Sequence, residues 1–142
     1  MRKRTRAREL ALQILYQIDL RGNEVRDDLE RILIRSGKAR DVTEFARDLV
    51  VGTADMSEEA DRLIASVAEH WDVRRMAAID RNILRMAVFE MSRRPDIPAK
   101  VSINEAIELG KKYSTAQSGA FINGILDRIR RQLDRDGEAG AN

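Results

Sequence analysis

The spacing of the apolar residues constrains the fold of this chain most strongly. Apolar side chains recur every three or four positions along nearly the whole sequence, and the first such stripe comprises Ala7, Ala11, Ile14, Leu15 and Ile18. That period is typical of amphipathic helices with one buried face, whereas a half-buried strand alternates strictly between apolar and polar residues. No segment shows that alternation. The pattern therefore predicts an all-α protein, a compact bundle of about seven helices.

Turn residues divide the stripes from one another. Gly22 and Gly37 follow the first and second stripes, the fourth stripe continues to Trp71, and Pro95 and Pro98 bracket a loop after the fifth. Glycine is favoured just beyond a helix C-terminus, and proline cannot continue a helix. These residues predict the ends of the first, second and fifth helices.

Capping residues predict several helix starts. Asp41 with Glu44 and Ser102 with Glu105 have the spacing of a capping box, in which two side chains satisfy the first amide groups of a helix. Ser57 is a further N-cap candidate, for the fourth helix. We therefore expect the third helix to open at Asp41 and the sixth at Ser102.

Length and composition favour one helical domain over residues 1–142. The chain has 142 residues, of which 35% are charged and only 4% aromatic, and it has no cysteine. A chain of this length can bury a core without cross-links, and the absence of cysteine excludes disulfides and thiolate metal sites. Residues 134–142 are polar and glycine-containing, so we expect a flexible tail there.

The sequence predicts a cytoplasmic protein that does not enter a membrane. No segment approaches the roughly 20 apolar residues that cross a bilayer. Polar residues at Gln13, Gln17 and Asp19 interrupt the first apolar stripe, so it does not resemble a signal peptide. The net charge is only +2, so any site for anions must come from local clustering.

Such a cluster lies at the start of the chain, in a basic arm over residues 1–8. Lys3 and four arginines precede or open the first helix, although the amide end of a helix repels cations. A helical wheel places Arg2 and Arg6 outward with Gln13, but Arg4 and Arg8 in line with the apolar face. Burying two guanidinium groups is costly, so we expect the first turns to project beyond the bundle or to be flexible.

A projecting arginine arm is suited to binding phosphate groups and stacking on bases, since guanidinium is a planar fork of donors. Tyr16, Tyr113 and Phe121 are candidate aromatic contacts for unstacked bases, and Lys111 and Lys112 precede the second of them. Two alternatives remain open at this point. A basic tail can simply aid solubility, and each aromatic side chain can be a packing residue.

No catalytic or metal site is assembled by the sequence. His70 is the only histidine and precedes Trp71 near the expected end of a helix, where a structural role is favoured. No glycine-rich phosphate loop, nucleophile motif or metal-ligand spacing is present. We expect a non-enzymatic binding protein without a metal or cofactor.

Five segments together resemble the NusB family of bacterial transcription antitermination factors over nearly the whole chain. They are RTRARELALQILYQ, FARDLVVGT, DRNILRMAVFEM, IPAKVSINEAIELGKKY and SGAFINGILDRI. The last three, in this order and spacing, are highly specific. The resemblance implies two small subdomains of antiparallel helices and no enzymatic activity. It also implies pairing with the small-subunit ribosomal protein NusE, binding to boxA RNA of nascent ribosomal RNA transcripts, and association with transcribing RNA polymerase.

Particular residues acquire roles by the same resemblance. It implies RNA contacts at Arg4, Arg6, Arg8, Gln13, Tyr113 and Phe121. It also places Tyr16 and Asp80 where the family contacts its ribosomal-protein partner, although Asp80 can equally cap its own helix. Gln117 departs from the family, in which some members carry an acidic residue that takes part in RNA binding.

Two further hypotheses compete with the RNA-binding one. A protein-only interaction module or homodimer would use apolar residues left outside the stripes, such as Leu12, Leu20 and Val88. Some RNA cytosine methyltransferases carry a NusB-like region, but this chain lacks the domain that binds the methyl donor. We therefore expect the first alternative to be the stronger competitor.

Overall fold

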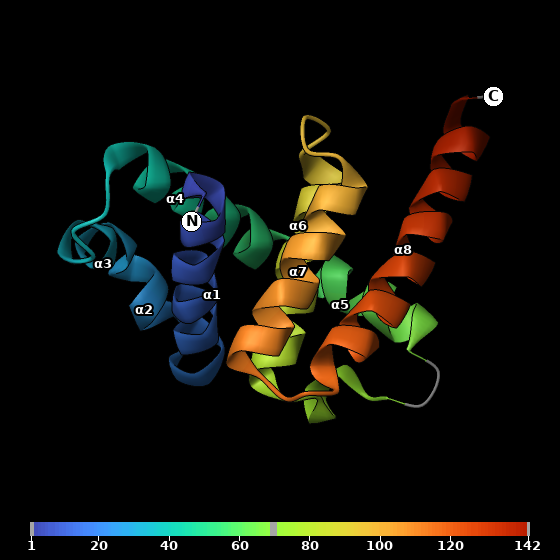
Figure 1. Cartoon of the computed structure of the whole chain (residues 1–142), viewed down its shortest axis with the longest axis horizontal. Coiled ribbons are helices and arrows are strands. Elements are labelled where there is room, and N and C mark those ends of the chain that lie inside the picture. The colour runs from blue at the N-terminus through green and yellow to red at the C-terminus, as the bar shows by residue number, and fades with distance from the viewer. Residues whose placement is uncertain (1, 69–70, 142) are drawn as a thin grey trace. The chain divides into compact units, whose positions relative to one another are not determined.

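The protein is all-α in the computed structural model, which describes residues 2–68 and 71–141. No strand occurs among them. The elements are α1 (Lys3–Arg21), α2 (Asn23–Asp27), α3 (Leu29–Arg35), α4 (Arg40–Asp55), α5 (Ser57–Val67), the 3₁₀ helix η1 (Val73–Arg75), α6 (Ala78–Arg93), α7 (Ala99–Tyr113) and α8 (Ser118–Ala141) (Figure 1). The all-α prediction is confirmed.

The helices form two compact units, Met1–Asp55 and Met56–Asn142. In the first unit α1 packs along α4, and α2 and α3 complete the bundle. Ala7 and Ala11 on α1 and Ala46 on α4 have no exposed surface. Small side chains at these positions allow the two helix backbones to approach each other closely. The start of α1, which carries the basic residues, is therefore held against α4.

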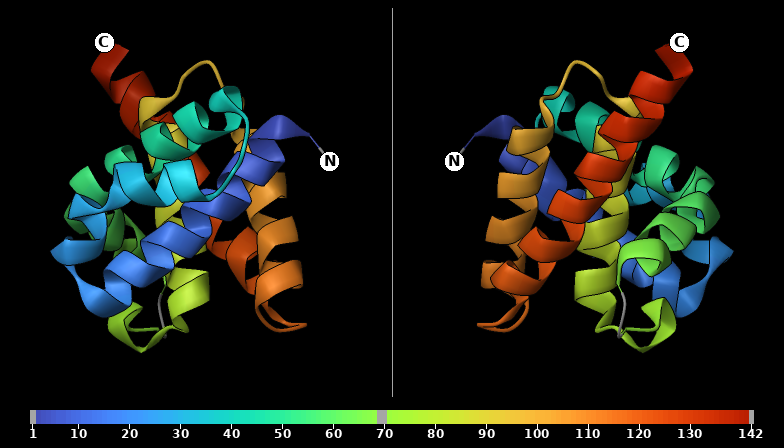
Figure 2. Two further views of the ribbon diagram at one scale, coloured as in Figure 1. Left: turned by 90° about the vertical axis from the view of Figure 1, so that its left-hand side faces the viewer. Right: turned by 90° about the vertical axis from the view of Figure 1, so that its right-hand side faces the viewer.

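In the second unit α6 lies against α5, α7 and α8, and α7 and α8 also pack together. The three long helices run alternately up and down in Figure 1, and α8 lies beside α6 and α7 in the right-hand view of Figure 2 as well. Ile83 and Leu84 of α6 and Leu126 of α8 are completely buried. This core fixes the N-terminal ends of α6 and α8, which carry the buried polar residues Asp80 and Ser118.

Glycine ends the first two helical segments as predicted. Gly22 (φ 84°) follows α1 and Gly37 (φ 68°) follows α3, and both have the positive φ that side chains other than glycine rarely adopt. The second predicted helix, however, is two short ones. Asp28 (φ −91°, ψ 4°) interrupts it between α2 and α3, because its backbone leaves the helical region.

Both predicted capping boxes are wrong. α7 opens one turn before Ser102, directly after Pro98, because proline fits the start of a helix, where no amide donor is required. Ser102 is instead buried within α7, and its hydroxyl donates to Glu90 Oε1 at 2.9 Å. α4 opens at Arg40, which pairs with Glu44 at 2.8 Å, so Glu44 does not reach back to the helix start.

Other helix boundaries also differ from the prediction. α5 ends at Val67, and Trp71 lies beyond it in the connection to η1. Ser57 is the first residue of α5 and not its N-cap, which is Met56, and no side-chain capping hydrogen bond is made there. α8 continues to Ala141, through most of the segment predicted to be a flexible tail. Ile129, five residues before that segment, is fully buried, so α8 is packed in the core shortly before the segment and its continuation is favoured.

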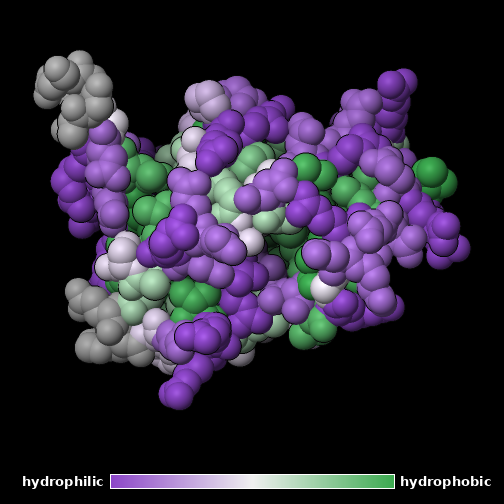
Figure 3. All heavy atoms as spheres, turned by 180° about the vertical axis from the view of Figure 1, so that it is seen from behind, coloured by the Kyte–Doolittle hydropathy of each residue, from purple (hydrophilic) through white to green (hydrophobic). Residues whose placement is uncertain are grey.

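The surface is largely polar. Hydrophilic residues predominate on the face seen in Figure 3, with hydrophobic atoms visible between them. Leu12 and Val88, which the sequence left available for a partner, are buried, whereas Leu20 is 58% exposed. None of the helices in the described part of the chain has the length and apolar character needed to span a bilayer.

The buried hydrogen bond between α6 and α7 gives a first prediction. Replacing Ser102 with alanine removes a donor from the buried Glu90 carboxylate, and we expect the free energy of unfolding to fall by about 1–2 kcal/mol. Urea denaturation followed by circular dichroism measures this change. The exposed Ser66, replaced with alanine in the same way, is the control, and an equal effect at both positions would contradict the prediction.

Candidate nucleic-acid interface

The basic start of the chain is helical and does not project as an arm. α1 begins at Lys3, and Arg8 is only 2% exposed, with its guanidinium carbon 5.4 Å from the centroid of the Phe45 ring. A guanidinium group loses little by leaving water when it lies over an aromatic face and its polar atoms have partners. The predicted projecting arm is therefore wrong, because Phe45 of α4 receives the cation that was expected to stay outside.

Two neighbouring cations also face α4. The guanidinium of Arg4 lies over the same Phe45 ring at 4.6 Å, and Lys3 Nζ is 2.6 Å from a carboxylate oxygen of Asp41. The hydrogen bond from Lys3 lowers the pKa of the Asp41 carboxyl below its usual value. These contacts anchor the first turn of α1, so its remaining cations have a fixed direction.

The outward face of α1 carries Arg2, Arg6 and Gln13, as the helical wheel predicts. All three are exposed, and no side-chain hydrogen bond or ion pair of Arg2 or Arg6 occurs within residues 2–68 and 71–141. Tyr16, one turn beyond Gln13, is half-buried. This face therefore offers two exposed guanidinium groups to a polyanion.

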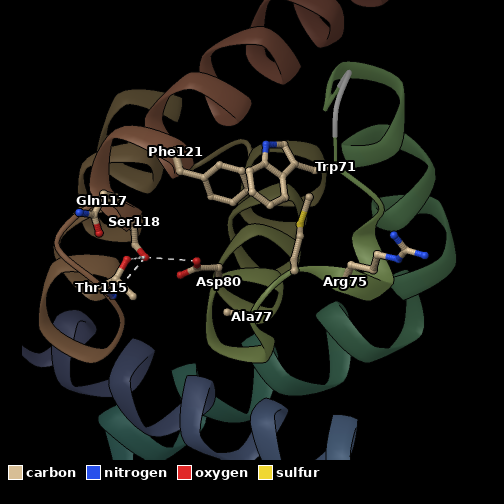
Figure 4. A pocket seen from close by; sticks show the side chains of 9 residues that line it. Trp71, Arg75, Ala77, Asp80, Thr115, Gln117, Ser118 and Phe121 are labelled. Atoms are coloured by element: carbon tan, nitrogen blue, oxygen red, sulfur yellow. Dashed lines mark hydrogen bonds between the residues drawn. The ribbon is translucent and has the colours of Figure 1, made fainter.

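A second group of predicted residues lies in the other unit, around a pocket of about 250 Å³. Figure 4 shows its side chains, which come from the segment before α6, from the start of α6, from the α7–α8 connection and from the first residues of α8. The lining residues are Trp71, Arg75, Met76, Ala77, Asp80, Thr115, Gln117, Ser118 and Phe121. Asp80 and Phe121 thus line one pocket, although the sequence assigned them to different partners.

Asp80 connects α6 to the start of α8 at one side of this pocket. Its Oδ2 accepts a hydrogen bond from Ser118 Oγ at 3.2 Å, and that hydroxyl also lies 3.0 Å from those of Ser114 and Thr115. Asp80 is the third residue of α6, and no side chain caps that helix from Ala77. Its observed contact is therefore with α8, and capping of its own helix is not observed.

The aromatic side of the pocket is formed by Trp71 and Phe121. Their ring centroids are 5.5 Å apart and the rings are inclined at 70°, an edge-to-face contact. Tyr113 lies elsewhere, at the end of α7, where Lys112 Nζ is 5.3 Å from its ring centroid. The sequence missed Trp71 as a site residue because its spacing continues the stripe of α5.

Arg81 holds one wall of the pocket in place, a role that the sequence gave no sign of. One of its guanidinium nitrogens, Nη1, lies 3.1–3.3 Å from the carbonyl oxygens of Val73, Arg74 and Met76. A cation here satisfies the carbonyl end of the short η1 helix. This contact fixes the segment that carries Arg75 and Met76, both of which line the pocket.

The predicted residues therefore form two sets, one in each unit. Arg4, Arg6, Arg8, Gln13 and Tyr16 belong to α1, and Asp80, Tyr113 and Phe121 to the second unit. His70, for which the sequence favoured a structural role, is outside the described residues. Within residues 2–68 and 71–141, no group of three or more histidine or acidic side chains is placed to hold a metal ion.

Comparison with known proteins gives one consistent result. The model of the NusB family matches residues 5–131. The chain is 50% identical to the transcription antitermination protein NusB of Anaeromyxobacter dehalogenans strain 2CP-1 over 132 residues, 92% of each chain. It is 48% identical to that of Desulforamulus reducens over 136 residues, which cover 96% of this chain and 93% of the relative.

Solved structures agree. NusB from T. maritima superposes with a TM-score of 0.82 at 39% identity, over 90% of each chain. A chain in the crystal structure of the antitermination factors NusB and NusE in complex with dsRNA superposes with a TM-score of 0.81 at 30% identity, over 93% of this chain and 98% of that one. The expectation of a non-enzymatic protein agrees with these relatives. The chain belongs to the NusB family, whose curated relatives are transcription antitermination proteins.

Proposed function

We propose that this protein is an RNA-binding antitermination factor that pairs with the ribosomal protein NusE and binds boxA RNA in nascent ribosomal RNA transcripts. One observation carries the proposal beyond family membership. Arg2 and Arg6 stand on the outward face of α1 with no ion-pair partner in the described part of the chain, while Lys3 and Arg4 anchor that helix to α4. Exposed guanidinium groups beside an anchored helix are suited to phosphate contacts.

The proposed RNA contacts are Arg4, Arg6, Gln13, Tyr113 and Phe121. Arg8 is buried in the structure, so its role in RNA binding is to hold α1 on Phe45 and thereby position Arg6. Single-stranded RNA is the proposed ligand, because its unstacked bases can reach aromatic side chains. Tyr16 is the proposed partner contact, and the protein acts with transcribing RNA polymerase in the cytoplasm.

The experiment that tests this proposal uses purified protein, purified NusE and a labelled boxA RNA. We expect weak RNA binding by the protein alone, tighter binding when NusE is added, and an affinity that falls steeply with salt, because phosphate contacts release counterions. A scrambled RNA of equal length is the control. Equal affinity for both RNAs with NusE present would contradict the boxA assignment.

A homodimer or protein-only module is the second candidate, and the exposed Leu20 favours it. Sedimentation of the full chain with and without RNA separates the two. The RNA-binding proposal expects the sedimenting species to change when RNA is added. A stable dimer that RNA neither changes nor competes with would favour the alternative.

A further inference from the structure

The α3–α4 turn, residues 36–40, presents two cations to solvent. Gly37 reverses the chain with its positive φ of 68°, and Ser36 Oγ donates to a carbonyl oxygen in the last turn of α3 at 2.6 Å. The same hydroxyl accepts a hydrogen bond from the amide of Lys38 at 3.3 Å, so the backbone that carries Lys38 is held on the end of α3. Lys38 is exposed and makes no ion pair in the described part of the chain, and the side chain of Arg40 is 90% exposed.

Two contacts place this turn beside the start of α1. Lys3 Nζ is 2.6 Å from Asp41, which follows Arg40 directly. The guanidinium of Arg4 lies over the ring of Phe45, one turn further along α4. The first turns of α1 and α4 therefore lie together, as Figure 1 and the left-hand view of Figure 2 show. The cations of the α3–α4 turn and those of α1 thus belong to one surface of the first unit.

This surface carries a larger net positive charge than the whole chain. Residues 2–6 and 38–44 contain six lysines and arginines and only two acidic residues, whereas the net charge of the chain is +2. Both acidic residues already have a cationic partner, Lys3 for Asp41 and Arg40 for Glu44. The pair of Arg40 with Glu44 is exposed, so it is weak and is readily exchanged for another anion. The excess of cations attracts polyanions to this end of the unit.

The composition and extent of the surface favour a nucleic-acid backbone over an acidic protein segment. Four of its six cations are arginines, whose planar group can donate two parallel hydrogen bonds to one phosphate. The cations are spread over two elements, α1 and the α3–α4 turn, so successive phosphates of one strand can be contacted. The surface is also continuous with the outward face of α1, for which RNA is the proposed ligand.

We propose that the α3–α4 turn is a second RNA contact, at which Lys38 and Arg40 bind phosphates of the nucleotides that flank boxA. The inference rests on the proposed RNA-binding function and extends it to a longer stretch of the transcript. Phosphate contacts carry no sequence information, so the flanking nucleotides are held whatever their bases. The turn therefore adds affinity and orientation, and the choice of sequence is left to the boxA contacts.

The test compares two labelled RNAs, each bound by the complex of the full-length protein with purified NusE. One RNA is boxA alone, and the other is boxA extended at both ends by unstructured nucleotides. We expect the double variant Lys38→Gln/Arg40→Gln to bind the extended RNA about fivefold more weakly than the parent, with a salt dependence that is shallower by about two ions. It should bind boxA alone as tightly as the parent does. Fluorescence anisotropy across a salt series measures these quantities.

The double variant Arg130→Gln/Arg131→Gln on α8 is the matched control. Both arginines are exposed, and Arg131 pairs at 2.8 Å with Asp127, four positions away, as Arg40 pairs with Glu44. This control removes the same two charges and should bind both RNAs as the parent does. Urea unfolding curves of the two double variants should match that of the parent, because all four substituted side chains are exposed.

Four outcomes would overturn the inference. They are unchanged binding of the extended RNA by Lys38→Gln/Arg40→Gln, an equal loss for the short and the extended RNA, an equal loss in the α8 control, and weaker binding of NusE in the absence of RNA. The last outcome would assign the turn to the protein partner. If the parent complex still prefers boxA to a scrambled RNA in any of these cases, the proposed function stands and only the second contact is lost. Absence of that preference in the parent complex would contradict the proposed function itself.

Discussion

Replacing Arg8 with alanine is expected to lower the free energy of unfolding by about 2–4 kcal/mol, the larger of the effects on stability expected here. The side chain is 2% exposed and lies over Phe45, so its removal leaves a cavity between α1 and α4 and deprives its buried contacts of a partner. Urea denaturation followed by circular dichroism measures the change. Arg8→Lys should be intermediate, because lysine keeps the charge but lacks the planar group that stacks.

Arg6→Ala is the control for this experiment. Arg6 is two positions away on the same helix, but it is exposed, so its replacement should change stability by no more than about 0.5 kcal/mol. Equal stability of the Arg8→Ala variant and the parent protein would contradict the packing role of Arg8. A large loss in Arg6→Ala would show instead that the whole basic segment is structural.

The contrast between these arginines shows what the sequence could and could not predict. The helical period fixes the direction of each side chain, so the wheel correctly placed Arg2, Arg6 and Gln13 outward and Arg8 inward. The prediction of a projecting arm failed in its estimate of the free energy of burying these cations. Projection of the arm was inferred from the cost of burying a cation, but Phe45, distant along the chain, offsets that cost by stacking.

The helical period also made the helices themselves predictable. The exact residues at which they start were not predictable. Gly22 and Gly37 act through their own backbone conformation, so the ends of α1 and α3 could be predicted. Ser102 looks like a cap in the sequence, but its real partner is Glu90 on the preceding helix. A capping pattern does not reveal such a tertiary contact, since the same hydroxyl can serve either purpose.

The pocket illustrates the same limit at the level of a site. Trp71, Asp80 and Phe121 lie on different elements, and their approach follows from the packing of α8 against α6 and the anchoring of η1 by Arg81. Resemblance to the NusB family selected Asp80 and Phe121 but could not reveal that they face one cavity. Asp80 Oδ1 is shielded from solvent and has no hydrogen-bond partner in the described part of the chain, which is visible only once Ser118 is seen to satisfy Oδ2.

The largest effect on binding is expected for Arg6→Glu. Reversing this charge removes one phosphate contact and repels the neighbouring phosphate, so the affinity of the protein–NusE complex for boxA RNA should fall at least about tenfold at low salt. The slope of affinity against salt concentration should also become shallower by about one ion, because one fewer counterion is released. Fluorescence anisotropy of a labelled RNA across a salt series measures both quantities.

Arg35→Glu is the matched control for this prediction, because Arg35 is exposed on α3 in the same unit and the change in net charge is identical. If affinity depended only on net charge, the two variants would weaken RNA binding equally and the outward face of α1 would have no special role. A local contact predicts a large loss and a shallower salt slope for Arg6→Glu alone. Because Arg6 does not pack in the core, an unchanged unfolding curve would show that the loss arises at the RNA contact.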